Sequence, residues 1–239
     1  MDQAILFDMG GTLDGDGLHW LDRFGALYAE AGVKVPRETL QLAFDAAERL
    51  AANDEAMARA PLEEMLDRHV AWQFETLGNE RFAELVNDTL RRRIVAEFAA
   101  IVRRAAAVNV EILAELRTRG FRLGVVSNGC GNVDVLCADL GYAPFLSLVV
   151  DSRRVGLFKP DPAIYSYAAA RLALQPSSIL MVGDSLDRDV RPAKAVGMRT
   201  AWLRGPSAAP HLDGSAADFV LQALYELPAV LAARERTVA

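Results

Sequence analysis

The chain has 239 residues, of which 52% are hydrophobic and 24% charged, with a formal net charge of −6. This length suits one large domain or two smaller ones, and the composition is ordinary for a globular protein. The acidic balance argues against a nucleic-acid partner, and the absence of a signal-peptide pattern or of ~20 consecutive apolar residues argues against a membrane protein.

The first element is a short apolar run, Ala4-Ile5-Leu6-Phe7, which ends at Asp8 and is followed by Gly10-Gly11. Such a run, bounded by glycines, predicts a buried strand of a parallel sheet. In open α/β sheets, ligands bind beyond the carboxyl ends of the strands. We therefore expect Asp8 to lie at a ligand site.

Residues 18–104 are rich in Ala, Leu, Glu and Arg, and their apolar residues recur at helical spacing. The pattern predicts four helices, which together would form a small bundle with its own core. We expect His69 to pack inside this bundle rather than to act chemically. The four helices are expected near residues 18–31, 36–52, 61–72 and 82–98.

From Ala105 onward the chain alternates between helix and strand, which predicts a parallel sheet with right-handed crossovers. The fold class is therefore α/β, with a Rossmann-like parallel sheet core and an inserted α-helical bundle cap. The core is expected to comprise residues 1–16 and 105–239, and the cap residues 17–104. Helices are predicted at 110–119, 133–140, 162–172 and 188–196, and strands at 121–126, 146–150, 179–182 and 199–203.

Cys130 and Cys137 are the two cysteines, and we expect both on one helix. They form neither a C-x-x-C pair nor a metal-ligand spacing. A reduced, cytoplasmic protein is the expectation that follows.

Polar residues follow several of the predicted strands. Asp8 and Asp184 each come after an apolar strand, and two carboxylates at one sheet edge repel each other unless a divalent cation lies between them. Oxygen ligands of this kind suit Mg²⁺. The hydroxyl of Ser127 and the ammonium of Lys159 would then bind the remaining oxygens of a phosphate, and the Gly10-Gly11 backbone N–H groups would approach it closely. The pattern indicates a site for a small phosphorylated substrate.

Four segments in this order resemble the haloacid dehalogenase superfamily, in the form with a helical cap inserted after the first motif. They are AILFDMGGTLD, LGVVSNG, VGLFKPDPAIY and ILMVGDSLDRDV. The resemblance implies that Asp8 is a nucleophile that forms an aspartyl phosphate, and that Ser127 and Lys159 bind the phosphoryl group. It further implies that Mg²⁺ is held by Asp8, Asp184 and the backbone carbonyl of Gly10.

The resemblance extends to residues that support these groups. Asp189 corresponds to a supporting acid, expected outside the metal's direct ligands, where it would orient metal-bound water or Lys159. Asn128 is expected to support the motif that contains Ser127, and Gly11 to contact the phosphate.

Position 10 departs from the family pattern, because phosphatases of this family carry an acid two residues after the nucleophile and this chain has Gly10. That acid protonates the leaving alcohol and then activates water, which is typically worth ~10²–10⁴ in rate. Asp14 and Asp16 would replace it only if the cap turned one of them inward; otherwise they are hinge or capping residues. His19 is a weaker third candidate.

Three functions are consistent with these residues. The first is a Mg²⁺-dependent phosphohydrolase that is slow or limited to good leaving groups, and the second is a phosphate-ligand-binding or partner-binding protein on the same fold. The third is cleavage of a C–halogen or C–P bond. The paired acids of GDSLDRD favour a metal over dehalogenation, and a cap with Lys34 alone as a Schiff-base candidate disfavours C–P cleavage. We take the first as the hypothesis.

Overall fold

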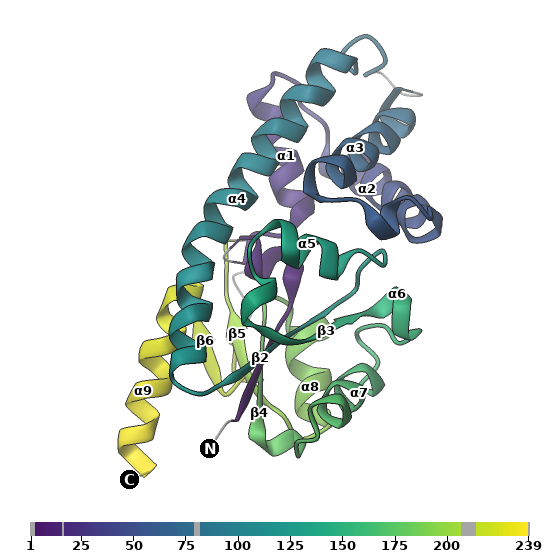
Figure 1. The fold of residues 1–239 in the computed structure, drawn as a ribbon. Coiled ribbons are helices and arrows are strands. Elements are labelled where there is room, and N and C mark those ends of the chain that lie inside the picture. Colours follow the sequence, from purple (N-terminus) through teal and green to yellow (C-terminus); the bar gives the residue numbers. More distant parts are fainter. Residues whose placement is uncertain (1–2, 16, 79–81, 207–213, 239) are drawn as a thin grey trace.

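The computed structural model describes residues 3–15, 17–78, 82–206 and 214–238. Six parallel strands form one sheet in the order β3-β2-β1-β4-β5-β6 (Figure 1). The predicted α/β class with a Rossmann-like parallel sheet is therefore confirmed. The strands are β1 (Ala4–Phe7), β2 (Arg122–Ser127), β3 (Leu146–Asp151), β4 (Ile179–Gly183), β5 (Arg199–Leu203) and β6 (Phe219–Leu221).

Strand β1 lies between β2 and β4, and its four residues are completely buried. Phe7 is in register with Val125 of β2 and Val182 of β4. All three strands point the same way, so the residues that follow them emerge at one edge of the sheet. This edge is where Asp8, Ser127 and Asp184 lie.

Alternate residues of β1 point to opposite faces of the sheet, as the two-residue period of a strand requires. Ala4 and Leu6 pack in the cluster with helices α7 (Ala163–Leu172) and α8 (Arg191–Ala195). Ile5 and Phe7 pack in the larger cluster on the other face. The helices α4 (Asp88–Thr118), α5 (Val133–Asp139) and α9 (Leu227–Val238) are among those that contribute to that cluster.

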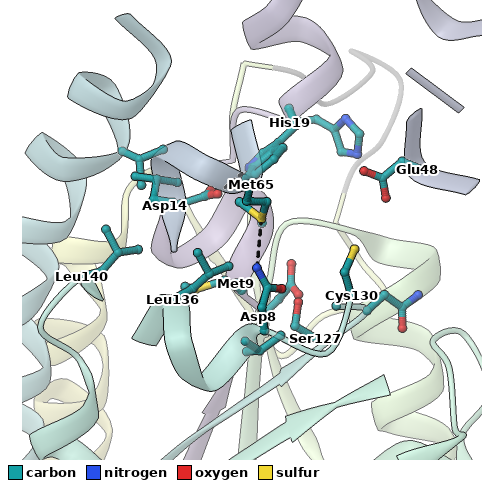
Figure 2. Close-up of a pocket in the computed structure, with 18 of the residues that line it drawn as sticks. Asp8, Met9, Asp14, His19, Glu48, Met65, Ser127, Cys130, Leu136 and Leu140 are labelled. Carbon is teal, nitrogen blue, oxygen red and sulfur yellow. Dashed lines mark hydrogen bonds between the residues drawn. The ribbon is translucent and has the colours of Figure 1, made fainter. Parts of the chain in front are cut away.

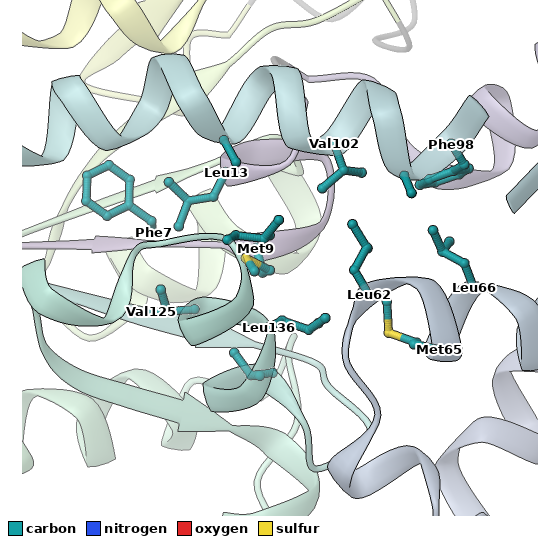
Figure 3. Close-up of a cluster of buried hydrophobic side chains, with 14 of the residues drawn as sticks. Phe7, Met9, Leu13, Leu62, Met65, Leu66, Phe98, Val102, Val125 and Leu136 are labelled. Atoms are coloured by element: carbon teal, nitrogen blue, oxygen red, sulfur yellow. The ribbon is translucent and has the colours of Figure 1, made fainter. Parts of the chain in front are cut away.

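The insertion between β1 and β2 forms a group of helices beyond the carboxyl edge of the sheet (Figure 1). We call α1 (Trp20–Glu30), α2 (Arg37–Asn53), α3 (Leu62–Gly78) and the first half of α4 the helical group. Its apolar side is continuous with the sheet core: Figure 3 shows Phe7 and Val125 linked through Met9 and Leu136 to Leu62. His69 is 1% exposed and stacks on Phe24, so it packs inside the group.

Helix α4 runs through 31 residues from the helical group to the side of the sheet (Figure 1). The sequence predicts two helices here, near 82–98 and 110–119, and that prediction is wrong. The intervening residues include Ala105–Ala107 and contain neither Gly nor Pro, so nothing interrupts the helix. The expected domain boundary at residues 104 and 105 falls inside this helix.

Several details differ from the sequence prediction. Cys130 lies before α5 rather than on it, and both cysteines are free thiols. The short elements β6 and α6 (Ser152–Val155) were not predicted, because three- and four-residue elements carry little periodicity. The 12-residue helix α9 was not predicted either. None of the described helices has the length and apolar character needed to cross a membrane.

The segment after β1 is held by two buried side chains that donate to one carbonyl. Asn109 Nδ2 of α4 donates to Leu13 O at 2.8 Å, and the Tyr142 hydroxyl donates to the same oxygen at 2.6 Å. This carbonyl lies five residues beyond Asp8. The two bonds therefore tie the Asp8 segment to α4 and to the chain after α5.

Replacing Tyr142 by Phe should lower the free energy of unfolding by about 1 kcal/mol, because one buried hydrogen bond is lost while Asn109 still satisfies the carbonyl. Urea unfolding measures the change. Tyr225→Phe, at a residue 66% exposed, is the control and should leave the stability unchanged. Equal stability of the wild type and Tyr142→Phe would show that this hydrogen bond does not stabilise the fold.

Candidate active site

Asp8 stands at the end of the central strand, and its amide continues the sheet by donating to Val182 O at 2.9 Å. Its side chain is buried, and Oδ1 accepts a bond from Lys159 Nζ at 2.5 Å. A buried carboxylate requires such a partner, because desolvating an unpaired charge costs several kcal/mol. The ammonium therefore holds Asp8 at the sheet edge, with its second oxygen, Oδ2, left for other contacts.

Lys159 bridges two carboxylates, since its Nζ also donates to Asp189 Oδ1 at 2.7 Å. Burial alone lowers the pKa of Lys159, but the charges of Asp189 and Asp8 outweigh it and hold that pKa above its usual value. Asn128 fixes the backbone of this lysine by two bonds. Its Oδ1 accepts from Lys159 N at 2.8 Å and its Nδ2 donates to Lys159 O at 2.9 Å.

Three carboxylates gather here: one oxygen each of Asp8, Asp184 and Asp189 lies within 4.8 Å of the others. Asp189 Oδ2 accepts from Ser185 N at 3.0 Å, whereas Asp184 Oδ1 is buried with no hydrogen-bond partner in the described part of the chain. Burial raises the pKa of Asp184 to about 8, and the charges of Asp8 and Asp189 add to the rise.

This arrangement fits a bound cation. A single ammonium cannot balance three carboxylates, and a buried carboxylate oxygen without a donor is costly. Hard oxygen ligands around an open position are the environment that Mg²⁺ prefers. The cluster could therefore hold a metal ion.

The two glycines after Asp8 differ in what the backbone demands of them. Gly11 has φ +85°, and a Cβ there would lie 2.5 Å from Asp184 Oδ2, so no other residue fits. Gly10 has φ −73°, and a Cβ there would meet nothing closer than Trp20 Nε1 at 3.8 Å. A side chain at position 10 is thus compatible with the local structure.

A cavity of about 160 Å³ lies between the sheet edge and the helical group. Figure 2 shows Asp8 and Ser127 on one side of it, with His19 and Glu48 on the other. The cavity is also lined by Asn128, Lys159 and Gly10. Behind this lining, Asp189 contacts Lys159, and Asp184 lies next to Gly11. The structure thus gathers the site residues expected from the sequence around one cavity and the carboxylates behind it.

Asp14 lies at the cavity wall and is nearly completely buried. Its Oδ1 accepts from Gly11 N at 2.6 Å, and its Oδ2 accepts from Trp20 Nε1 at 2.5 Å. Burial raises the pKa of Asp14, and the nearby Arg23, 3.7 Å away, opposes the rise. Asp14 therefore both braces the start of the helical group and faces the cavity.

His19 and Asp16 are the two other candidate replacements for an acid at position 10. His19 lines the cavity and caps α1 by accepting from Leu21 N at 3.2 Å. Burial and the charge of Arg188 lower the pKa of His19. Asp16 lies outside the described residues.

Sequence reasoning missed the part of the cavity wall that the helical group and its neighbours supply. Glu48 and Phe44 are one turn apart on α2 and both face the cavity, a spacing that a helical wheel reveals only once the position of the cavity is known. Arg188 sits in the recognised GDSLDRD segment but was not singled out. The other missed residues lining the cavity include Met65, Cys130 and Leu136.

Comparison with known proteins finds a family model and several relatives that match this chain in sequence. The family model for haloacid dehalogenase-like hydrolases matches residues 3–197. A phosphoserine phosphatase of Thermus thermophilus is 37% identical over 107 residues, which cover 42% of this chain and 43% of that protein. A glyceraldehyde 3-phosphate phosphatase of Methanopyrus kandleri is 35% identical over 122 residues, covering 49% and 52%. The chain thus matches only about half the length of these curated relatives.

Two solved structures resemble the whole chain. A HAD phosphatase from Thermococcus onnurineus has a TM-score of 0.55 at 22% identity, covering 97% of this chain and 98% of that one. A dehalogenase crystallised with an intermediate complex has a TM-score of 0.63 at 20% identity, covering 96% of each chain. At these identities the likeness establishes the fold alone.

The carboxylate cluster predicts a pH-dependent response to Mg²⁺. Because the pKa of Asp184 is raised from 3.8 to about 8, the metal-free folded chain binds a proton that the unfolded chain releases, and its stability falls as pH rises between these values. A cation competes with that proton. At a fixed Mg²⁺ concentration, set to ten times the dissociation constant at about pH 8.5, the gain at that pH should be about 1.4 kcal/mol, or about 3 to 6 °C in melting temperature, and it should be smaller at about pH 6.

Thermal melting with MgCl₂ and with EDTA measures this gain. Asp184→Asn should abolish the Mg²⁺ response, while Asp187→Asn, at an exposed carboxylate three residues away, should keep it. A Mg²⁺ gain that is the same at both pH values would contradict the assignment.

Proposed function

The chain belongs to the haloacid dehalogenase-like hydrolase family, and from this premise we propose that it is a Mg²⁺-dependent phosphohydrolase acting on a small phosphorylated substrate. The observation that carries the proposal is the pairing of Asp8 with Lys159 beside a buried, unpartnered oxygen of Asp184. That arrangement provides a nucleophile, a phosphate-binding cation and a place for a metal within one cavity edge. The names of the phosphatase relatives point to the same substrate class.

The reaction takes place in two displacements at phosphorus. In the first, Oδ2 of Asp8 attacks the phosphorus and the bond to the ester oxygen breaks; that oxygen keeps the electron pair and takes a proton from solvent water. In the second, water attacks the phosphorus of the aspartyl phosphate and releases a proton to solvent, and the Asp8 oxygen leaves as a carboxylate. Lys159 holds Oδ1 during both steps and so aims Oδ2 at the substrate.

The surrounding residues bind the charge on the phosphoryl oxygens. Ser127 and Lys159 donate from the cavity wall, whereas the Gly11 amide, expected from the sequence to contact the phosphate, donates to Asp14 Oδ1 at 2.6 Å. Asp189 keeps Lys159 oriented through its 2.7 Å contact. Mg²⁺, held by Asp8, Asp184 and the Gly10 carbonyl, would neutralise the carboxylates and polarise the phosphoryl group.

The missing acid at position 10 limits this reaction. Without a proton donor the first step depends on how well the leaving group carries negative charge, and without a base the second step depends on unassisted water. We therefore propose slow turnover, favouring acyl or aryl phosphates over alkyl phosphates. The alternative is a catalytically weak protein that binds a phosphate ligand or a partner. The three-carboxylate cluster disfavours C–halogen cleavage, and a cap with Lys34 alone as a Schiff-base candidate disfavours C–P cleavage.

Asp8→Asn should abolish Mg²⁺-dependent hydrolysis of p-nitrophenyl phosphate and acetyl phosphate, because an amide oxygen is a poor nucleophile toward phosphorus. Release of p-nitrophenol or of phosphate measures the rate. Asp187→Asn, whose carboxylate is exposed and pairs with Arg191, is the control and should remain active. Equal activity in the wild type and Asp8→Asn would favour the binding function instead.

Gly10→Asp should raise kcat for alkyl phosphates by about tenfold or more, toward the ~10²–10⁴ that a general acid supplies. Aryl phosphates should gain less, because p-nitrophenolate leaves without a proton. The backbone at residue 10 accepts the side chain, and the nearest atom to its Cβ is 3.8 Å away. Gly10→Asn matches the size without the acid and should show no gain; a gain as large with Asn would refute the acid argument.

A further inference from the structure

A chain of hydrogen bonds crosses the helical group and ends at the cavity. The Tyr28 hydroxyl of α1 donates to Gln73 Oε1 at 2.8 Å, and Gln73 Nε2 lies 2.7 Å from His69 Nδ1, both on α3. His69 Nε2 lies 2.9 Å from Glu48 Oε1 on α2. The first three side chains are buried, whereas the Glu48 side chain is 47% exposed.

The chemistry of each group fixes the direction of this chain. Since the amide oxygen of Gln73 accepts from Tyr28, its Nε2 is the group that faces His69 and must donate to Nδ1. The imidazole then carries its proton on Nε2 and donates it to Glu48. A neutral histidine therefore holds Glu48 in place and leaves its negative charge uncompensated.

Glu48 directs that charge into the cavity. It raises the pKa of His19 at the start of α1, against the larger effect of burial. It also adds to the effect of burial, which raises the pKa of Cys130, after β2, to about 12. In the ranges that the structure describes, no lysine or arginine pairs with it. An exposed glutamate is solvated by water and needs no buried partners. The series of hydrogen bonds that ends at Glu48 therefore serves to position its carboxylate.

The cations Lys159 and Arg188 line the cavity. Lys159 bonds to carboxylates at the sheet edge, whereas the charge of Arg188 acts both on Asp184 there and on His19, whose pKa it lowers. With a divalent cation held at the carboxylate cluster as proposed, that cation and Lys159 make the sheet edge the anion-binding end of the cavity, while Glu48 places a carboxylate at the helical group. A substrate with an anion at one end and a cation at the other matches this polarity.

Aromatic rings complete the negative side. Phe44 precedes Glu48 by one turn of α2, and Phe44, His19 and Trp20 line the same cavity. The rings of His19 and Phe44 are 5.9 Å apart. Aromatic faces beside a carboxylate are a recurring environment for ammonium groups.

We propose that Glu48 binds an ammonium group on the alcohol part of the substrate, so that the enzyme acts on phosphate monoesters of small amino alcohols. This inference rests on the proposed phosphohydrolase function for the position of the phosphate. The cavity of about 160 Å³ is close to the ~150 Å³ that accommodates benzene, which suits an alcohol of two or three carbons. His69, Gln73 and Tyr28 are positioning residues that act through Glu48.

Calorimetric titration of the Asp8→Asn variant with Mg²⁺ present tests the inference without turnover. The probes are O-phosphoethanolamine and n-propyl phosphate, which have the same length and differ in one ammonium. We expect O-phosphoethanolamine to bind at least about tenfold more tightly, and we expect Glu48→Gln in this background to remove the preference while n-propyl phosphate binds within about twofold of before. Glu38→Gln, an exposed glutamate at the start of α2, is the control and should keep the preference.

The outcomes separate the proposed ammonium site from the proposed phosphohydrolase function. Equal affinity for the two probes, or a preference that survives Glu48→Gln, overturns the ammonium site even if p-nitrophenyl phosphate is hydrolysed. Tighter binding of phosphoglycolate, which carries a carboxylate in place of the ammonium, overturns it as well. Absence of hydrolysis by the wild type together with an ammonium preference refutes the phosphohydrolase function and leaves the ammonium site standing, and binding of neither probe refutes both.

Discussion

The contact between Lys159 and two buried carboxylates is the constraint on which the rest of the site depends. Three acids meet at the carboxyl edge of the sheet, and Lys159 is the cation bonded to two of them, Asp8 and Asp189. Burial makes each uncompensated charge expensive, so this group of residues is stable only with a further cation or a proton. The same excess of negative charge provides the attraction for a divalent ion, and a phosphate would bind to that ion and to Lys159.

The adjacent glycines separate structural need from chemical choice. Gly11 is required, because its backbone is left-handed and Asp184 leaves no room for a Cβ. Gly10 meets neither restriction, so the lack of an acid there is a property of this chain's chemistry rather than of its packing. On the proposed function, the residues for phosphate binding are retained while the usual proton donor is absent, which shifts the expected substrates toward better leaving groups.

The helical group contributes polarity as well as cover. It packs on the sheet through a continuous apolar cluster, so the cavity has a preformed roof (Figure 3). Within the helical group, three buried side chains from α1 and α3 form hydrogen bonds that orient Glu48 on α2. On the proposed function, the phosphate would lie at the metal and Lys159 and the ammonium at Glu48, so the two ends of the cavity would set the orientation of a bound substrate.

The sequence by itself determined the parallel α/β sheet, the helical insertion and the strand ends that carry Asp8, Ser127 and Asp184, because strand and helix periodicity and the rule for parallel strand ends are local signals. The sequence pattern did not predict three features: the continuous course of α4, the short strand β6 and the position of Cys130. These features depend on packing or on elements too short to show a period. Only the tertiary structure decided that Lys159 bonds to Asp8, 151 residues away, that Asp184 has an oxygen without a partner, and that Glu48 faces the cavity. Contacts between distant segments arise from the whole fold, and no window of the sequence contains them.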